Sequence, residues 1–119
     1  MLCMGNAHAD RLNYLLQHPK RIGILESVLL ASKEMLIYDD QNRLLTDIDL
    51  FFMTDSGLYV AEYKMSDSKL QKGRHQLRIA RRFVKDNFYE DPTGILVYGD
   101  NYTHRVIYNG QQGSSGKAY

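Results

Sequence analysis

The feature that most constrains this chain is the stretch from Asp47 to Lys64, where two runs of strand-forming residues flank a short polar turn. The turn is Thr54-Asp-Ser-Gly57, and Asp, Ser and Gly are typical turn residues. The flanking runs are rich in aromatic and branched residues, so the stretch predicts a β-hairpin. Both faces of this hairpin are largely apolar, which favours a strand pair buried between two layers.

Closing the turn with Met53 opposite Leu58 predicts a register in which two acidic residues face each other. One face then carries the pairs Met53–Leu58, Phe51–Val60, Asp49–Glu62 and Asp47–Lys64. Opposed side chains have Cβ atoms ~5 Å apart, and at that separation two carboxylates repel by roughly 3 kcal/mol for an effective dielectric near ~20. Asp49 and Glu62 therefore require either a proton or a shared cation. Oxygen ligands favour Mg²⁺ or Mn²⁺ over Zn²⁺, for which no Cys or His ligand lies nearby in the sequence.

Asp49, twelve intervening residues and then Glu62-x-Lys64 at the end of an apolar strand resemble the active-site signature of the PD-(D/E)xK nuclease superfamily. This superfamily includes restriction endonucleases, Holliday junction resolvases and nuclease-related domains. Ile48 stands where a proline usually precedes the first acid. The resemblance covers roughly residues 23–108, and it implies an α/β fold with a restriction-endonuclease-like core of order αβββαβ, in which helices flank a mixed central sheet.

The resemblance also implies roles for individual residues. Asp49, Glu62 and the backbone carbonyl of Tyr63 would hold Mg²⁺ or Mn²⁺, with Glu26 on a preceding helix as a further ligand. Asp47 and Glu34 are the alternatives to Asp49 and Glu26. Lys64 would orient or deprotonate a water molecule, and Gln76, on the helix after the motif, would position a phosphate or that water.

The function implied is metal-dependent endonucleolytic hydrolysis of phosphodiester bonds, with DNA as the expected substrate and branched or junction DNA as one form of it. A non-catalytic nucleic-acid-binding module with the same fold is the alternative. A third hypothesis is a domain in which the acidic residues have a structural role and the basic face binds another protein.

Charge along the chain is strongly uneven, although the net charge is only +1. The segment from Lys64 to Lys85 holds eight of the fifteen basic residues and one acid, a net charge of +7 that leaves −6 on the remainder. No Glu is interleaved within this segment to form i,i+4 pairs, so phosphate would relieve the repulsion on a helix here. We expect nucleic acid to contact Lys69, Lys72, Arg74, Arg78, Arg81 and Arg82.

The remaining pattern predicts the other elements. Helices are expected over residues 6–17, 21–33 and from about residue 66 to residue 87 or 88, with strands over residues 35–38, 94–98 and 104–108. A long helix between two strands predicts a right-handed crossover, which makes residues 94–98 parallel to the Glu62 strand. His8 and His18 are expected to face solvent.

Length and composition complete these expectations. The 119 residues fit a single domain over residues 1–110, followed by a flexible tail over residues 111–119. One cysteine, the lack of a long apolar run and the lack of a signal-peptide pattern favour a cytoplasmic protein without membrane contact. Cleavage of two strands would need a homodimer or a partner protein.

Overall fold

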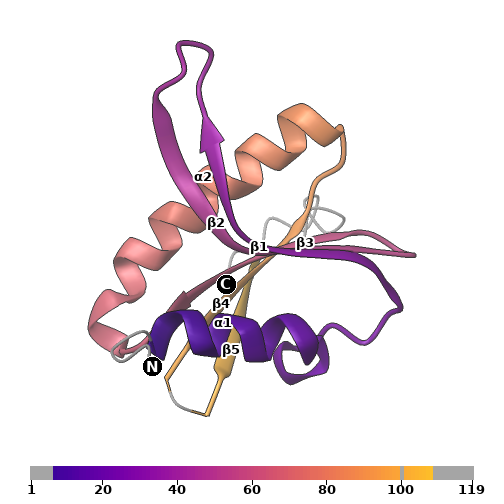
Figure 1. Ribbon diagram of the computed structural model, residues 1–119, viewed down its shortest axis with the longest axis vertical. Coiled ribbons are helices and arrows are strands. Elements are labelled where there is room, and N and C mark those ends of the chain that lie inside the picture. The colour runs from indigo at the N-terminus through magenta and orange to yellow at the C-terminus, as the bar shows by residue number, and fades with distance from the viewer. Residues whose placement is uncertain (1–6, 100, 109–119) are drawn as a thin grey trace.

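A five-stranded mixed sheet forms the centre of the protein, and one helix covers each of its faces (Figure 1). The computed structural model describes residues 7–99 and 101–108. In chain order the elements are α1 (Ala7–Gln17), η1 (Pro19–Ile22), β1 (Val28–Tyr38), β2 (Leu44–Thr54), β3 (Leu58–Lys64), η2 (Asp67–Lys69), α2 (Leu70–Phe88), β4 (Thr93–Tyr98) and β5 (Thr103–Tyr108). The predicted α/β class and mixed sheet are confirmed.

The strands lie in the order β1-β2-β3-β4-β5, so sequence neighbours are also spatial neighbours. Three of the four pairings are antiparallel, and β3 with β4 is parallel. α2 supplies the crossover between β3 and β4 that a parallel pair requires, as the sequence predicted. Figure 1 shows the β1–β2 hairpin extending away from the rest of the sheet.

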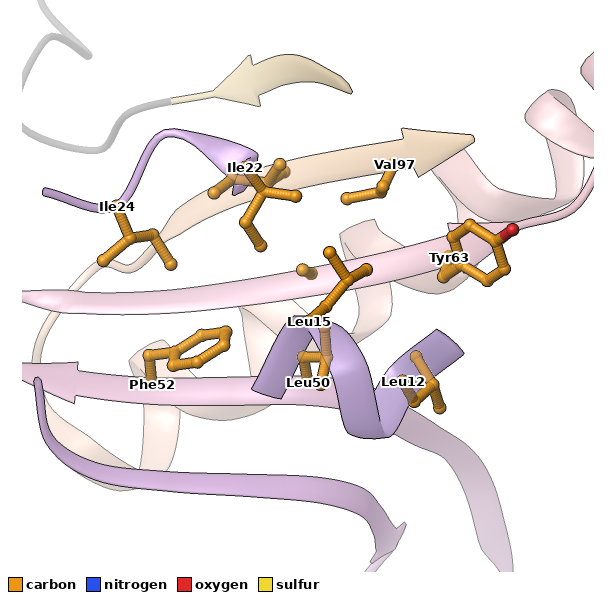
Figure 2. Close-up of a cluster of buried hydrophobic side chains, with 10 residues drawn as sticks. Leu12, Leu15, Ile22, Ile24, Leu50, Phe52, Tyr63 and Val97 are labelled. Carbon is orange, nitrogen blue, oxygen red and sulfur yellow. The ribbon is translucent and has the colours of Figure 1, made fainter. Parts of the chain in front are cut away.

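The face covered by α1 buries a compact apolar cluster. Leu12 and Leu15 of α1 pack over side chains from β2, β3 and β4, as Figure 2 shows, and Ile22 and Ile24 close one side. The strand residues are Leu50, Phe52, Ala61, Tyr63, Ile95 and Val97. The period-two alternation of β2 and β3 therefore directs alternate residues to this face.

The opposite face packs against the apolar stripe of α2. Leu77, Ala80 and Val84 contact Phe51, Leu58, Val60 and Leu96. Gly73 lets the first turns of α2 approach the sheet closely, because a Cβ there would lie 2.8 Å from Leu96 Cδ1. The close approach fixes where the N-terminal half of α2 sits over β3 and β4.

The helix predicted over residues 21–33 is wrong, since this segment holds only the end of η1, a short connection and the first half of β1. Gly23 adopts a left-handed conformation, with φ of 91°, and ends η1 immediately. From Val28 the chain pairs with β2 along the edge of the sheet. Leu25, Val28 and Leu29 have the i, i+3, i+4 spacing of a helix face, but Leu25 and Leu29 are exposed, and Val28 and Leu29 belong to this edge strand.

The other predicted elements are confirmed within one to four residues at their ends, apart from the start of the first strand. Asp39 stabilises the β1–β2 turn by accepting hydrogen bonds from the backbone of Gln41 and Arg43, which lowers its pKa. The predicted tail over residues 111–119 lies outside the described residues. Neither helix in the described part of the chain combines the length and apolar character that crossing a membrane would need.

Candidate functional site

The predicted hairpin register is confirmed near the turn, where Met53 faces Leu58 and Phe51 faces Val60. The recorded ladder between β2 and β3 ends at Leu50 and Ala61, so the ladder pairs predicted for Asp49 and for Asp47 do not form. Beyond that point β2 continues to pair with β1, and β3 continues to pair with β4 as far as Lys64 and Tyr98. The two strands thus separate where the acidic residues lie.

Side chains replace the missing ladder in this opening. The backbone N–H of Asp49 donates to Glu62 Oε2 at 3.2 Å, and the backbone N–H of Tyr63 donates to Asp49 Oδ2 at 2.8 Å. Each carboxylate therefore accepts a hydrogen bond from the strand opposite its own. The proximity of Asp49 and Glu62 that the sequence predicted is confirmed, although it arises from these cross-strand bonds.

Both acidic side chains are withdrawn from solvent, with Glu62 0% and Asp49 4% exposed. Burial raises the pKa of Glu62 to about 9, and the adjacent charge of Asp49 adds to the effect. Burial also raises the pKa of Asp49, and the hydrogen bond from Tyr63 opposes that rise. Asp47 contributes further negative charge to both, whereas Lys64 favours their ionised forms. Glu62 therefore keeps its proton at neutral pH, and positive charge bound in the opening would favour the ionised forms of both acids.

Lys64 lies at the end of β3 beneath the first turns of α2. A Cβ on Gly73 would lie 3.1 Å from Lys64 Cγ and 3.5 Å from Lys64 Cε, so the aliphatic stem of the lysine packs against this glycine. The missing side chain at Gly73 leaves the space that the stem occupies. The ammonium group is close enough to oppose, in part, the rise in the pKa of both acids.

Three buried polar atoms among the described residues have no hydrogen-bond partner, and they are Glu62 Oε1, Gln76 Oε1 and Arg74 Nε. Buried polar atoms are rarely left unsatisfied without a functional reason. Glu62 Oε1 is a carboxyl oxygen in the opening, and oxygen atoms of this kind are the ligands that hard cations prefer. The donor chemistry therefore fits Mg²⁺ or Mn²⁺, although no three His, Cys, Asp or Glu side chains converge as a metal cluster within residues 7–99 and 101–108.

His8 was predicted to face solvent, and its side chain is 39% exposed, but α1 also brings its ring to the opening. Its Nε2 lies 3.3 Å from the carbonyl oxygen of Tyr63 and 3.7 Å from Asp49 Oδ2. Arg11, one turn further along α1, donates from Nη1 to the hydroxyl of Tyr63 at 2.8 Å. No local pattern in the sequence indicates these contacts, because they join residues more than fifty positions apart.

Glu26 does not lie on a helix, and it contacts the opposite end of β3. It accepts hydrogen bonds from Tyr59 Oη at 2.5 Å and Ser56 Oγ at 3.2 Å, beside the β2–β3 turn. The bond from Tyr59 lowers the pKa of Glu26, whereas burial and Glu26 raise the pKa of Tyr59 to about 12. Its alternative, Glu34, is exposed on β1 and pairs with Lys33 at 3.7 Å.

The predicted phosphate-contacting residues fall into two groups on α2 and the segment before it. Lys69, Lys72, Arg78 and Arg82 are exposed, and Arg82 pairs with Asp86 at 3.7 Å. Arg81 instead packs across Gly94 and binds Asp91 at 3.0 Å and the Pro92 carbonyl at 3.3 Å. Arg81 therefore has a structural role. Arg74, which also lies on α2, is half-buried. A hollow of about 270 Å³ is lined by Arg78, Arg81, Arg82, Lys85 and Asp91.

Comparison with known proteins gives no family assignment, since no protein-family model matches the chain and no curated protein matches it significantly.

Proposed function

We propose that this protein is a metal-dependent nuclease that hydrolyses phosphodiester bonds in nucleic acid, with DNA as the substrate class. The observation that carries the proposal is the pair of buried carboxylates, Asp49 and Glu62, in the opening between β2 and β3 with Lys64 beside them. Two acids withdrawn from water need positive charge to ionise at neutral pH, and a divalent cation supplies it.

The arrangement of the sheet supports the same proposal. The elements run in the order helix, three strands, helix and strand, which is the order implied by the resemblance to the PD-(D/E)xK superfamily when α1, outside residues 23–108, takes the place of the first core helix. The first acid lies on β2, and the Glu62-x-Lys64 pair lies on β3. The helix that follows carries Gln76, whose Oε1 is buried without a partner. The helix expected to carry Glu26 is absent, so we leave Glu26 out of the site.

In this mechanism Asp49, Glu62 and the Tyr63 carbonyl would hold the cation, and Gln76 would position the phosphate or the attacking water. A bound divalent cation would lower the pKa of a water molecule and offset charge on the transition state. Lys64, held against Gly73, would orient that water and stabilise negative charge on the phosphoryl oxygens. The exposed basic residues of α2 would bind the backbone without reading sequence.

A panel of supercoiled, linear, single-stranded and four-way DNA, incubated with Mn²⁺ or Mg²⁺, tests this function. We expect the wild type to cleave at least one substrate and Asp49→Asn to lose that cleavage. Asp55→Asn is the matched control, because Asp55 is exposed at the turn. Cleavage that survives Asp49→Asn unchanged would overturn the proposed site.

A non-catalytic nucleic-acid-binding module is the second candidate, and the exposed basic surface of α2 favours it independently of the acids. Such a module would bind DNA with an affinity that falls as the salt concentration rises. In a plot of log binding constant against log salt concentration, each lost phosphate contact would reduce the slope by ~1. Salt-dependent binding that Arg78→Ala weakens, together with no cleavage on any substrate, would select this alternative.

A further inference from the structure

We propose that His8 is a further protein donor of the metal site, beside Asp49, Glu62 and the Tyr63 carbonyl, an inference that rests on the proposed metal-dependent function. His8 Nε2 lies within 3.7 Å of two oxygen atoms assigned to the cation, Asp49 Oδ2 and the carbonyl oxygen of Tyr63. Of these three residues, the sequence resemblance assigns metal roles only to Asp49 and Tyr63. The contribution of α1 is visible only in the folded chain.

The spacing of these atoms suits a shared ion. Nε2 lies 3.3 Å from the carbonyl oxygen and 3.7 Å from the carboxylate oxygen. Two donors that each bind one ion at ~2.1 Å lie ~3.0–3.6 Å apart for the usual bond angles. A movement of a few tenths of an ångström is therefore enough for His8 Nε2 to share a cation with either oxygen.

The imidazole is held in place from the surrounding elements. Its ring centroid lies 5.6 Å from that of Tyr63, and the Tyr63 hydroxyl accepts from Arg11 and donates to the Gly99 carbonyl at 3.3 Å. Leu12 and Leu15 anchor α1 in the core. His8 thus sits on a rigid element, as a ligand that must keep its geometry requires.

A nitrogen donor changes which ion the site prefers. Carboxylate and carbonyl oxygens suit Mg²⁺, whereas imidazole favours transition-metal dications such as Co²⁺, Ni²⁺ and Zn²⁺. No histidine lies near the two acids in the sequence, but in the folded chain His8 reaches Asp49 from α1. The site therefore prefers a transition-metal dication over Mg²⁺, and His8 is the source of that preference.

The test measures binding of CoCl₂ and MgCl₂ separately, by the rise in melting temperature with ion concentration. We expect the wild type to bind Co²⁺ more tightly than Mg²⁺. His8→Gln, which substitutes an amide near the position of Nε2, is expected to weaken Co²⁺ binding by roughly tenfold or more and Mg²⁺ binding by less than about threefold. His18→Gln is the control, because His18 stacks on Tyr14 near the far end of α1.

A second readout does not depend on stability. Co²⁺ bound to nitrogen should shift the proton resonances of the His8 ring much more than those of His18, His75 and His104. Equal losses of Co²⁺ and Mg²⁺ affinity in His8→Gln, or an unshifted His8 ring in the Co²⁺-bound wild type, would overturn the role of His8. Neither ion stabilising the wild type would instead overturn the metal site itself, and with it the proposed nuclease.

Discussion

Two glutamates near opposite ends of β3 show how environment separates residues of one type. Glu62 is fully buried in the opening between β2 and β3, and its pKa is raised to about 9. Glu26 contacts the turn end, where the hydroxyls of Tyr59 and Ser56 donate to it, and its pKa is lowered. Hydrogen bonds from hydroxyl groups stabilise the ionised form of Glu26. Burial beside a second acid destabilises the ionised form of Glu62, which a bound cation would stabilise.

The largest expected difference between the two glutamates is in cleavage. Glu62→Gln keeps the size of the side chain and removes its charge, so we expect Mn²⁺-dependent cleavage to fall by at least ~100-fold if the site acts as proposed. Glu26→Gln should leave cleavage within about twofold of the wild type. Single-turnover rates at saturating Mn²⁺ measure both. Equal losses in the two variants would show that the two ends of β3 do not differ in function.

The two glutamates should also give opposite dependences of stability on pH. The unfolded Glu62 ionises near its ordinary value of 4.5, whereas the folded protein keeps the proton to about pH 9. Its stabilising effect is therefore complete below pH 4.5 and is lost as the pH rises toward 9, by up to about 1.4 kcal/mol per unit. Denaturant unfolding without metal should show this slope, and Glu62→Gln should remove it.

For Glu26 the sign is reversed, because its folded pKa lies below the unfolded value. Its stabilising effect is present above pH 4.5 and is lost as the pH falls through the folded pKa. Glu26→Gln should therefore reduce the dependence of the free energy of unfolding on pH below about pH 4.5 and leave its dependence at alkaline pH unchanged. A variant that changed the alkaline side would contradict the assigned environments.

Gly73→Ala should affect the acidic end of β3 through packing. The added methyl group would meet Leu96 Cδ1 at 2.8 Å and Lys64 Cγ at 3.1 Å. Overpacking of this kind destabilises by ~1–3 kcal/mol, against a gain in helix propensity of ~1 kcal/mol. We expect a net loss of stability and weaker cleavage, because Lys64 is displaced. Gln71→Ala, at an exposed position of the same helix, controls for propensity. A more stable and fully active Gly73→Ala would refute the contact.

Tyr59→Phe should give the smallest effect. The substitution removes the hydroxyl that donates to Glu26 and leaves the ring in place. We expect a loss of about 1 kcal/mol in the free energy of unfolding and unchanged cleavage, because the bond lies at the turn end. Chemical denaturation measures the first and the nuclease assay the second. A marked loss of cleavage in Tyr59→Phe would contradict this, because it would show that the turn end of β3 affects the acidic site at the other end.

The turn end of the β2–β3 hairpin was more predictable from sequence than the connection before β1. The hairpin follows from two runs of strand-forming residues on either side of turn residues, and this local signal predicted the register from Met53 to Leu50. The helix expected over residues 21–33 failed because the exposed leucines of an edge strand can match a helical period. Gly23, which ends η1, was the local signal against it.

Residues that act across long sequence separations were not predictable. His8 meets Tyr63 only because α1 packs on the sheet, and neither residue has a neighbouring pattern that indicates the other. Arg81 was grouped with the basic face, since its contacts with Asp91 and Pro92 depend on how β4 follows α2. The separation of β2 from β3 beyond Leu50 also arises from the whole sheet, because each strand continues with a different partner.

The exchange of hydrogen bonds between Asp49 and Glu62 has an evolutionary consequence. Each side chain satisfies an amide of the neighbouring strand, so truncating either one to alanine would strand a main-chain donor inside the protein. If the site acts as proposed, a descendant that had lost cleavage would still be under selection for polar acceptors at both positions. Such a lineage would tolerate asparagine and glutamine at these two positions. Acidic side chains there would therefore distinguish relatives that keep the proposed chemistry from relatives that keep only the fold.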